Sequence, residues 1–205
     1  MVQRKKDEVY YAILEKAKEE FIEQGFQKAS LRNIAREAGI THSNIYHYFG
    51  NKDALFRAVL IAVLNYLELG KAFLIAHEEN HADFTLEDHM QIIDKTSEYL
   101  DANRELLKLL FFKANGSSLA NIKNEIIDWF TDTYRLTLRK LSEKYNLGAV
   151  CVSDFFIHNI SSIWMNFLME SLMHDLSLEE MCRDGRNMMN FIYYGWGGVL
   201  SLDCK

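Results

Sequence analysis

The chain has 205 residues, of which 49% are hydrophobic and 25% are charged, and its net charge is −6 at pH 7. This balance is that of an ordinary folded soluble protein and argues against a disordered chain. The sequence contains no proline. Because proline breaks helix interiors and marks many turns, its absence, together with long stretches of apolar residues at helical spacing, predicts an all-α fold.

The charge is unevenly distributed along the chain. Residues 1–57 contain ten Lys or Arg and eight Asp or Glu, a net charge of +2. Residues 58–205 contain thirteen Lys or Arg and twenty-one Asp or Glu, a net charge of −8. A weakly basic segment followed by an acidic body is compatible with a DNA-reading module joined to a domain that avoids DNA.

The sequence predicts a cytoplasmic protein with no membrane segment. Residues 1–8 carry basic side chains with no apolar run behind them, unlike a secretory signal. The longest uninterrupted apolar run, residues 58–64, is far shorter than the about 18 residues that a membrane helix needs. The spacing of the three cysteines fits neither a zinc knuckle nor a disulfide framework, so we expect reduced thiols.

Apolar residues at helical spacing predict a first helix over residues 7–24. Gly25 follows this stretch, and a glycine commonly ends a helix in the left-handed conformation. Phe26 is then expected to contact Phe21, the contact that accompanies a Schellman ending. The apolar stripe consists of Val9, Tyr10, Ile13, Leu14, Ala17 and Phe21.

Two short helices are predicted within residues 30–50. Ser30 is placed to cap the first of them, which ends at Gly39. Thr41 is placed to cap the second, which ends at Gly50. Two short helices joined by a tight glycine turn are typical of a helix-turn-helix, whose second helix enters the major groove of DNA. A helical corner that binds nothing has a similar pattern.

The second short helix has a polar outer face. Ile45 and Phe49 are expected to point into the core, which leaves the other side chains largely outside. In a helix-turn-helix, the N-terminal residues of this helix meet the base edges. The outward set comprises Thr41, His42, Ser43, Asn44, Tyr46 and His47.

Five segments, in order and without gaps, carry a family resemblance. They are FIEQGF (21–26), ASLRNIA (29–35), AGIT (38–41), IYHYF (45–49) and NKDALF (51–56). Together they resemble the N-terminal domain of TetR-family regulators. Ser43 is a departure, since the family often has glycine there.

The resemblance implies an all-α protein with a three-helix helix-turn-helix DNA-binding domain at residues 1–51. A larger helical domain, residues 52–205, is then expected to bind a small-molecule effector and to form a homodimer through a four-helix bundle. The same resemblance implies a transcription regulator that is not an enzyme and holds no cofactor. It favours a repressor that binds a palindrome in double-stranded DNA and is released by a mostly apolar small molecule.

The resemblance also implies which side chains meet DNA. Tyr46, His47 and Lys52 are expected to hold phosphates, Lys52 at a helix N-terminus whose dipole favours anions. Asn44 is suited to adenine through its side-chain amide. The remaining candidates for contact with DNA are Arg32, Thr41, His42 and Ser43.

Beyond residue 51 the hydrophobic periodicity predicts further helices. Asn51, Thr85 and Ser177 are placed to cap three of them, and an acidic residue follows both Thr85 and Ser177 three positions later, as in a capping box. Gly116 marks a break between two helices. The expected spans are 52–76, 85–100, 106–112, 122–145, 150–174 and 178–199.

One apolar stripe on the last predicted helix is a candidate dimer interface. It contains a glycine, which permits the close approach of a second helix. A palindrome is read by a two-fold symmetric protein, which favours the dimer interpretation. The alternative is that the stripe belongs to the core of a single chain. The stripe consists of Met181, Gly185, Met188 and Ile192.

The aromatic side chains of the second domain are candidates for an effector pocket, with His158 and Asn159 as polar anchors. The alternative is that these aromatics form ordinary core and that His158 is an interior histidine with its hydrogen bonds satisfied. The aromatic candidates are Phe111, Phe112, Trp129, Tyr134, Phe155, Phe156, Trp164 and Phe167.

Two rival functions remain. Residues 77–81 match the H-E-x-x-H pattern, in which His77 and His81 would bind zinc and Glu78 would act as the base of a hydrolase. A solvated, charged helix end explains the same residues. The other rival is a TetR-like co-regulator that acts through protein contacts without binding DNA. No glycine-rich phosphate loop, nucleophile elbow or paired-cysteine site occurs in the sequence.

Overall fold

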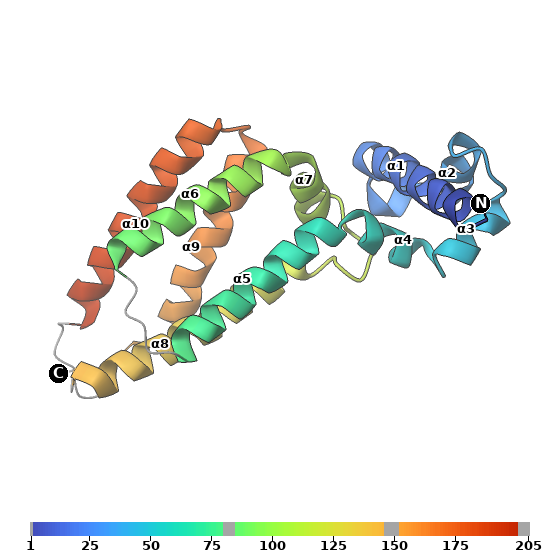
Figure 1. Ribbon diagram of the computed structural model, residues 1–205. Coiled ribbons are helices and arrows are strands. Elements are labelled where there is room, and N and C mark those ends of the chain that lie inside the picture. Colours follow the sequence, from blue (N-terminus) through green and yellow to red (C-terminus); the bar gives the residue numbers. More distant parts are fainter. Residues whose placement is uncertain (1, 80–84, 146–151, 201–205) are drawn as a thin grey trace. The chain divides into compact units, whose positions relative to one another are not determined.

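The computed structural model describes residues 2–79, 85–145 and 152–200, and every regular element within these ranges is an α-helix (Figure 1). The predicted all-α fold is therefore confirmed. No helix in these ranges is long and apolar enough to cross a membrane. The helices are α1 (Val2–Lys28), α2 (Leu31–Glu37), α3 (His42–Tyr48), α4 (Lys52–Val59), α5 (Ile61–Glu79), α6 (Leu86–Ala102), α7 (Arg104–Phe112), α8 (Ile122–Tyr145), α9 (Asp154–Met173) and α10 (Leu178–Leu200).

The described residues fall into two compact units. The first contains the chain up to Leu69 together with Glu105–Ile122, and the second contains Gly70–Arg104 and the residues from Lys123 onward. The chain therefore leaves the first unit within α5, returns to it in α7 and leaves again at the start of α8. The predicted domains, 1–51 and 52–205, were defined by function, as a DNA-binding and an effector-binding domain, and not by compact packing. Their boundary stays a prediction.

The core of the first unit is built around phenylalanines from α1 and α4. Phe21 stacks on Phe26 with ring centroids 6.2 Å apart, which confirms the predicted contact. Phe56 packs edge-on against both rings, with centroids 5.0 Å away in each case. Ile13, Ile34, Ile45, Leu55 and Leu60 fill the rest of this core and are fully buried.

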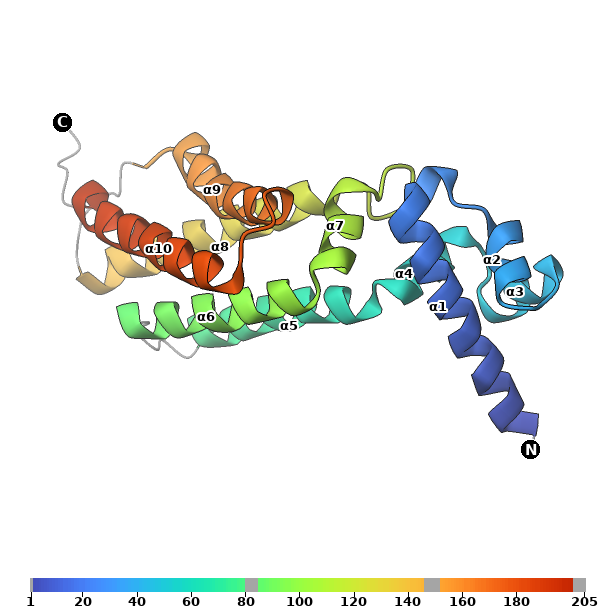
Figure 2. The same ribbon diagram turned by 90° about the horizontal axis from the view of Figure 1, so that it is seen from above.

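α1 bends at Gly25, which has φ 69° and ψ 170°. The amide of Phe26 donates a 2.9 Å hydrogen bond to the carbonyl of Lys113, on the segment between α7 and α8. A Schellman ending would direct this amide to a carbonyl of its own helix. Gly25 thus has the predicted positive φ, but its ψ is not that of the left-handed helical conformation, and the predicted Schellman ending at residue 24 does not form. The bend instead connects α1 to Lys113, between α7 and α8 (Figure 2).

The predicted helix caps form, with one exception. Asn51 accepts a 2.7 Å hydrogen bond from the amide of Ala54, and Ser30 accepts one from Asn33. Thr85 with Asp88 makes a capping box, as does Ser177 with Glu180. Thr41 occupies the N-cap position of α3, but its hydroxyl lies 3.0 Å from the Ser43 hydroxyl and caps no backbone amide.

The single helix predicted over residues 52–76 is wrong, because the structure divides it into α4 and α5. The break falls at Leu60, whose φ of −91° and ψ of 3° lie outside the helical range. Leu60 is fully buried, so it packs in the core at the point where the helix axis changes. No glycine or proline lies near Leu60, so the sequence contains no local signal for the break.

In the second unit, α10 runs beside α6 (Figures 1 and 2). Gly185 lets the two helices approach so closely that an added Cβ would lie 2.8 Å from Ile93 on α6. Met181 and Ile192 are buried on the same face of α10, and Met188 is half-buried. The predicted dimer stripe therefore packs within its own unit, as the alternative interpretation had it. The outward face of α10 instead carries Asn187, Phe191, Tyr194 and Gly198.

Two glycines of the first unit are expected to differ in how much an added side chain costs. Gly25 and Gly39 have φ angles of 69° and 68°. The ψ of 170° at Gly25 adds a conformation that almost only glycine adopts, and an added Cβ there would meet the Lys113 carbonyl oxygen at 3.3 Å. An added Cβ at Gly39 meets nothing within 4 Å. Gly39→Ala is therefore expected to cost about 1 kcal/mol and Gly25→Ala about 2–3 kcal/mol. Equal losses of stability in urea unfolding would contradict this difference.

Candidate functional site

A short turn fixes the angle between α2 and α3. Gly39 adopts a positive φ, and its amide and that of Ile40 bond back to the carbonyls of Arg36 (3.1 Å) and Ala35 (3.0 Å). Ile34, Ala35 and Ile45 are buried beneath the turn. The pair α2–α3 thus has the predicted helix-turn-helix geometry, with α3 held by its apolar side.

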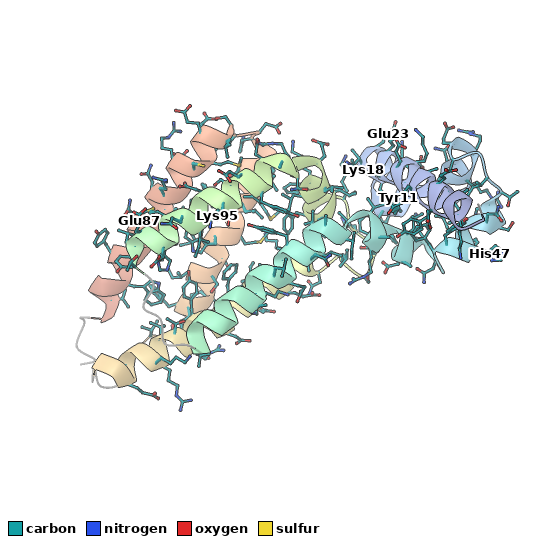
Figure 3. The ribbon with its side chains drawn as sticks, in the orientation of Figure 1. Tyr11, Lys18, Glu23, His47, Glu87 and Lys95 are labelled. Carbon is teal, nitrogen blue, oxygen red and sulfur yellow. The ribbon has the colours of Figure 1, made fainter. Side chains whose placement is uncertain are left out.

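The polar face of α3 is exposed, as the sequence predicted. Tyr46 is 48% exposed, and His42 is half-buried because its ring packs edge-on against Tyr46 with centroids 5.3 Å apart. Figure 3 shows His47 on α3. The remaining exposed candidates are Arg32 on α2 and Thr41, Ser43, Asn44 and His47 around α3.

A buried carboxylate anchors α2 to α1. Glu20 is only 8% exposed, and it accepts a 2.8 Å hydrogen bond from the amide of Ser30. It also accepts one from the side-chain amide of Asn33, whose oxygen in turn accepts a hydrogen bond from Arg36. Glu20 was not among the predicted residues, although an acidic residue three positions after Ala17 on the apolar face of a helix is a usable signal for a buried carboxylate.

Lys52 points toward the end of α1. Its ammonium donates a 3.2 Å hydrogen bond to the carbonyl of Gln27 and lies 4.9 Å from the centroid of the Phe26 ring. Burial lowers the pKa of Lys52, and the nearby carboxylate of Glu20 opposes that shift. The side chain thus joins α4 to α1 in addition to any contact that it makes with DNA.

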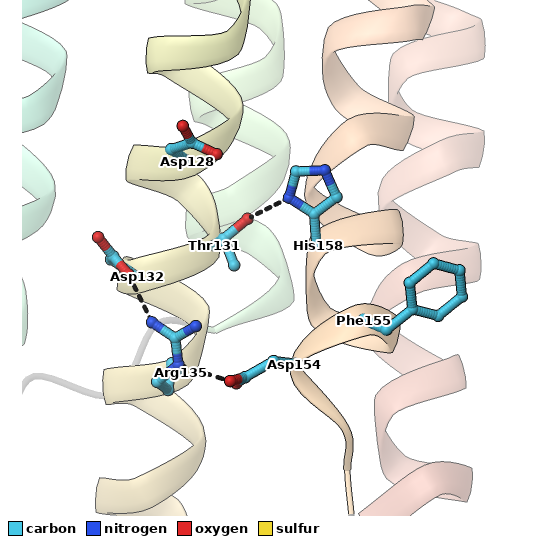
Figure 4. A pocket seen from close by; sticks show the side chains of 7 residues that line it. All are labelled: Asp128, Thr131, Asp132, Arg135, Asp154, Phe155 and His158. Carbon is cyan, nitrogen blue, oxygen red and sulfur yellow. Dashed lines mark hydrogen bonds and ion pairs between the residues drawn. The ribbon is translucent and has the colours of Figure 1, made fainter.

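The second unit contains an open groove between α8 and α9 (Figure 4). Its volume is about 460 Å³. Arg135 bridges two carboxylates across it, those of Asp132 on α8 and Asp154 on α9. The hydroxyl of Thr131 lies 3.4 Å from Nδ1 of His158. Two predicted pocket residues, Phe155 and His158, line this groove together with Asp128, Thr131, Asp132, Arg135 and Asp154.

Other predicted pocket residues form an aromatic cluster within the second unit. The indole N–H of Trp164 donates a 3.1 Å hydrogen bond to the hydroxyl of Tyr134, and burial raises the pKa of Tyr134. Trp196 on α10 packs beside Tyr134 and Phe156. Trp196 was not among the predicted pocket residues, because its helix carries the predicted dimer stripe.

The structure does not gather all the predicted pocket residues. Phe111 and Phe112 belong to the first unit. Trp129 packs against its neighbour Phe130, and the side chain of Asn159 donates to the carbonyl of Phe155 in its own helix. A role in effector binding for these residues stays a prediction.

The predicted zinc motif at His77, Glu78 and His81 runs into residues 80–84, which lie outside the described residues. Among the residues that the structure does describe, no group of three or more His, Cys, Asp or Glu side chains is arranged to hold a metal ion.

Residues 13–59 match the family model described as "Bacterial regulatory proteins, tetR family". The chain carries the N-terminal domain of the TetR family. This TetR-family segment contains most of α1, the α2–α3 pair and the whole of α4. The resemblance stated from five sequence segments is therefore confirmed.

The chain is similar to an uncharacterized HTH-type transcriptional regulator, YdgC, of Bacillus subtilis. The two are 27% identical over 101 residues, which are 49% of this chain and 51% of YdgC. An HTH-type transcriptional regulator of Escherichia coli, UidR, is 39% identical over 49 residues, 24% of this chain and 25% of UidR. The chain thus spans about half or less of the length of these curated relatives.

The fold is similar to those of solved bacterial regulators. NalD of Pseudomonas aeruginosa, the secondary repressor of the MexAB-OprM multidrug efflux pump, has a TM-score of 0.64 at 20% identity, covering 94% of this chain and 97% of NalD. The regulator FadR of Bacillus subtilis, solved in complex with stearoyl-CoA, has a TM-score of 0.59 at 16% identity, covering 88% and 97%. At these identities the likeness concerns the fold.

Proposed function

We propose that this TetR-family chain is a sequence-specific DNA-binding transcription regulator that responds to a small molecule. The observation that carries the proposal is the exposed polar face of α3, held by a buried α2–α3 turn inside the segment that matches the family. The family match and the fold also point to a regulator rather than an enzyme. A cytoplasmic location follows from this role.

On this proposal, α3 enters the major groove and its first residues read base edges. Asn44 is the candidate for adenine, with Thr41, His42 and Ser43 beside it. The Thr41 hydroxyl caps no backbone amide and lies 3.0 Å from the Ser43 hydroxyl, so the two hydroxyls would meet the DNA side by side. Arg32, Tyr46, His47 and Lys52 are then the candidates for phosphate contacts.

A selection from random DNA duplexes at near-physiological salt tests the proposal. We expect an enriched palindrome whose binding is lost in Tyr46→Ala and whose preference at one base pair is relaxed in Asn44→Ala. Tyr11→Ala is the matched control, because Tyr11 is 67% exposed on α1, is not a candidate contact for DNA and should leave binding unchanged. Retention of DNA without an enriched sequence, or no retention, would favour a co-regulator that acts through protein contacts.

Lys52 provides a second test through the salt dependence of binding. If its ammonium exchanges the Gln27 carbonyl for a phosphate, Lys52→Ala weakens binding at every sequence and lowers the salt slope by about 0.9. Lys95→Ala, which removes an exposed lysine of α6, is the control (Figure 3). An unchanged slope in Lys52→Ala would assign this side chain to its contacts with Gln27 and Phe26 alone.

The proposed effector is a mostly apolar small molecule that binds in the second unit and releases a repressor from its operator. The aromatic cluster around Tyr134 supports an apolar ligand, and the charged groove between α8 and α9 offers groups for a polar end. A mostly apolar ligand is compatible with two similar proteins: FadR was solved with bound stearoyl-CoA, and NalD is a repressor of a multidrug efflux pump.

We further propose a homodimer that pairs through the outward face of α10. Phe191 and Tyr194 are 70% and 68% exposed and lie on one side of this helix with Asn187 and Gly198, a spacing that suits packing against a second helix. Two-fold symmetry is what a palindromic operator requires.

Replacing an outward aromatic residue by a charged one tests the dimer. Phe191→Arg is expected to raise the dimer dissociation constant at least tenfold, because it buries an unpaired charge. Leu69→Arg on α5 is the control, since Leu69 is 69% exposed and lies outside the proposed interface. Sedimentation measures both, and an unaltered dimer in Phe191→Arg would exclude this face.

A further inference from the structure

The first turn of α2 is capped by residues from two helices. Ser30 is its N-cap residue, and the hydroxyl of Ser30 accepts a 3.3 Å hydrogen bond from the amide of Asn33. In a capping box, the side chain three positions after the cap also accepts a hydrogen bond from the amide of the cap residue. In α2 this second acceptor comes from α1 instead, because the amide of Ser30 donates to the carboxylate of Glu20 at 2.8 Å.

Two other helices of the chain show the ordinary arrangement. The carboxylate of Asp88 accepts a 2.9 Å hydrogen bond from the amide of Thr85 at the start of α6. At the start of α10, Glu180 accepts one of 2.8 Å from the amide of Ser177. In both cases the carboxylate belongs to the helix that it caps, so the cap forms wherever that helix lies. The cap of α2 is complete only while α2 lies against α1.

The carboxylate of Glu20 also fixes how α2 is placed on α1. One of its oxygens accepts from the amide of Ser30, and the other accepts from the side-chain amide of Asn33, one turn further along α2. Hydrogen bonds are directional, whereas the burial of Ile34 and Ala35 beneath α2 is not. Two directional contacts one turn apart therefore determine the rotation of α2, and a shift of α2 would leave a buried carboxylate without its donors.

The placement of α2 decides the placement of the side chains that are candidates for DNA contact. Arg32 is exposed on α2, between the two residues that Glu20 holds. α3 follows α2, because the amides of Gly39 and Ile40 in the turn between them bond back to carbonyls of α2. A rotation of α2 on α1 would therefore move both Arg32 and the polar face of α3.

We propose that Glu20 is a positioning residue for operator binding: from α1 it completes the cap of α2 and so fixes where Arg32 and α3 meet DNA. Glu20 is only 8% exposed and is not itself a candidate contact for DNA. A binding surface that is already in place loses less freedom on association, so this link contributes to affinity without touching the operator. The proposal rests on the proposed function and adds a residue on which that function depends.

Two double variants of the full-length chain separate this link from the cap itself. Both move the carboxylate from position 20 to position 33, so their net charge equals that of the wild type. In the reversed variant, Glu20→Gln with Asn33→Asp, the glutamine oxygen accepts from the amide of Ser30 and its amide donates to the new aspartate, which keeps the link. In the unlinked variant, Glu20→Leu with Asn33→Glu, α2 gains an ordinary capping box of its own and loses the link to α1.

Urea unfolding and titration with the operator duplex obtained from the selection measure both properties. The unlinked variant is expected to unfold at a higher urea concentration than Glu20→Leu alone, because the amide of Ser30 regains an acceptor. The reversed variant is expected to bind the operator within about threefold of the wild type, and the unlinked variant about tenfold or more weakly. The salt slope of the unlinked variant is expected to fall by about 0.9 as the phosphate contact of Arg32 is lost.

The outcomes separate this proposal from the proposed function. A selection that enriches no operator would overturn the function and the role of Glu20 with it. Equal operator affinities and salt slopes in the two double variants would leave the function standing and overturn the role of Glu20, since a merely structural role changes stability alone. A reversed variant that folds but binds as weakly as the unlinked one would overturn it too. The comparison holds even if Glu20→Leu alone does not fold.

Discussion

The edge-on packing of Phe56 against Phe21 and Phe26 is the contact on which the first unit depends. It joins α4 to α1 on both sides of the bend at Gly25, so the bend and the position of α4 are set together. The same arrangement puts the Phe26 ring under the ammonium of Lys52 and the Phe26 amide against the carbonyl of Lys113. Truncating one such buried ring costs a core about 3–5 kcal/mol.

The features that the sequence predicted are those decided by a few neighbouring residues. Ser30 and Asn51 cap their helices because a short polar side chain beside a free helix end accepts its amides wherever that helix lies. The positive φ at Gly25 and Gly39 follows from the glycine itself. The exposed face of α3 follows from the spacing of Ile45 and Phe49, which leaves the polar side chains outside.

The features that the sequence did not predict depend on partners far along the chain. Leu60 interrupts a helix that its own neighbours would continue, and no glycine or proline near it in the sequence marks the break. The glycine of the Met181–Ile192 stripe permits close approach to any helix, and only the fold shows that the partner is α6 of the same chain. The pairing of Asp53 with Ser118 spans 65 residues and has no local signature.

The buried carboxylate of Glu20 has an evolutionary consequence. Its two acceptor oxygens serve the amide of Ser30 and the side chain of Asn33, so an apolar replacement at position 20 would strand the Asn33 amide, and an apolar replacement at position 33 would remove a donor from Glu20. Position 20 should therefore keep a hydrogen-bond acceptor in related lineages, because an apolar residue there would also leave the amide of Ser30 without its acceptor. An ancestral reconstruction that places an apolar residue at position 20 should be less stable than one that keeps the carboxylate.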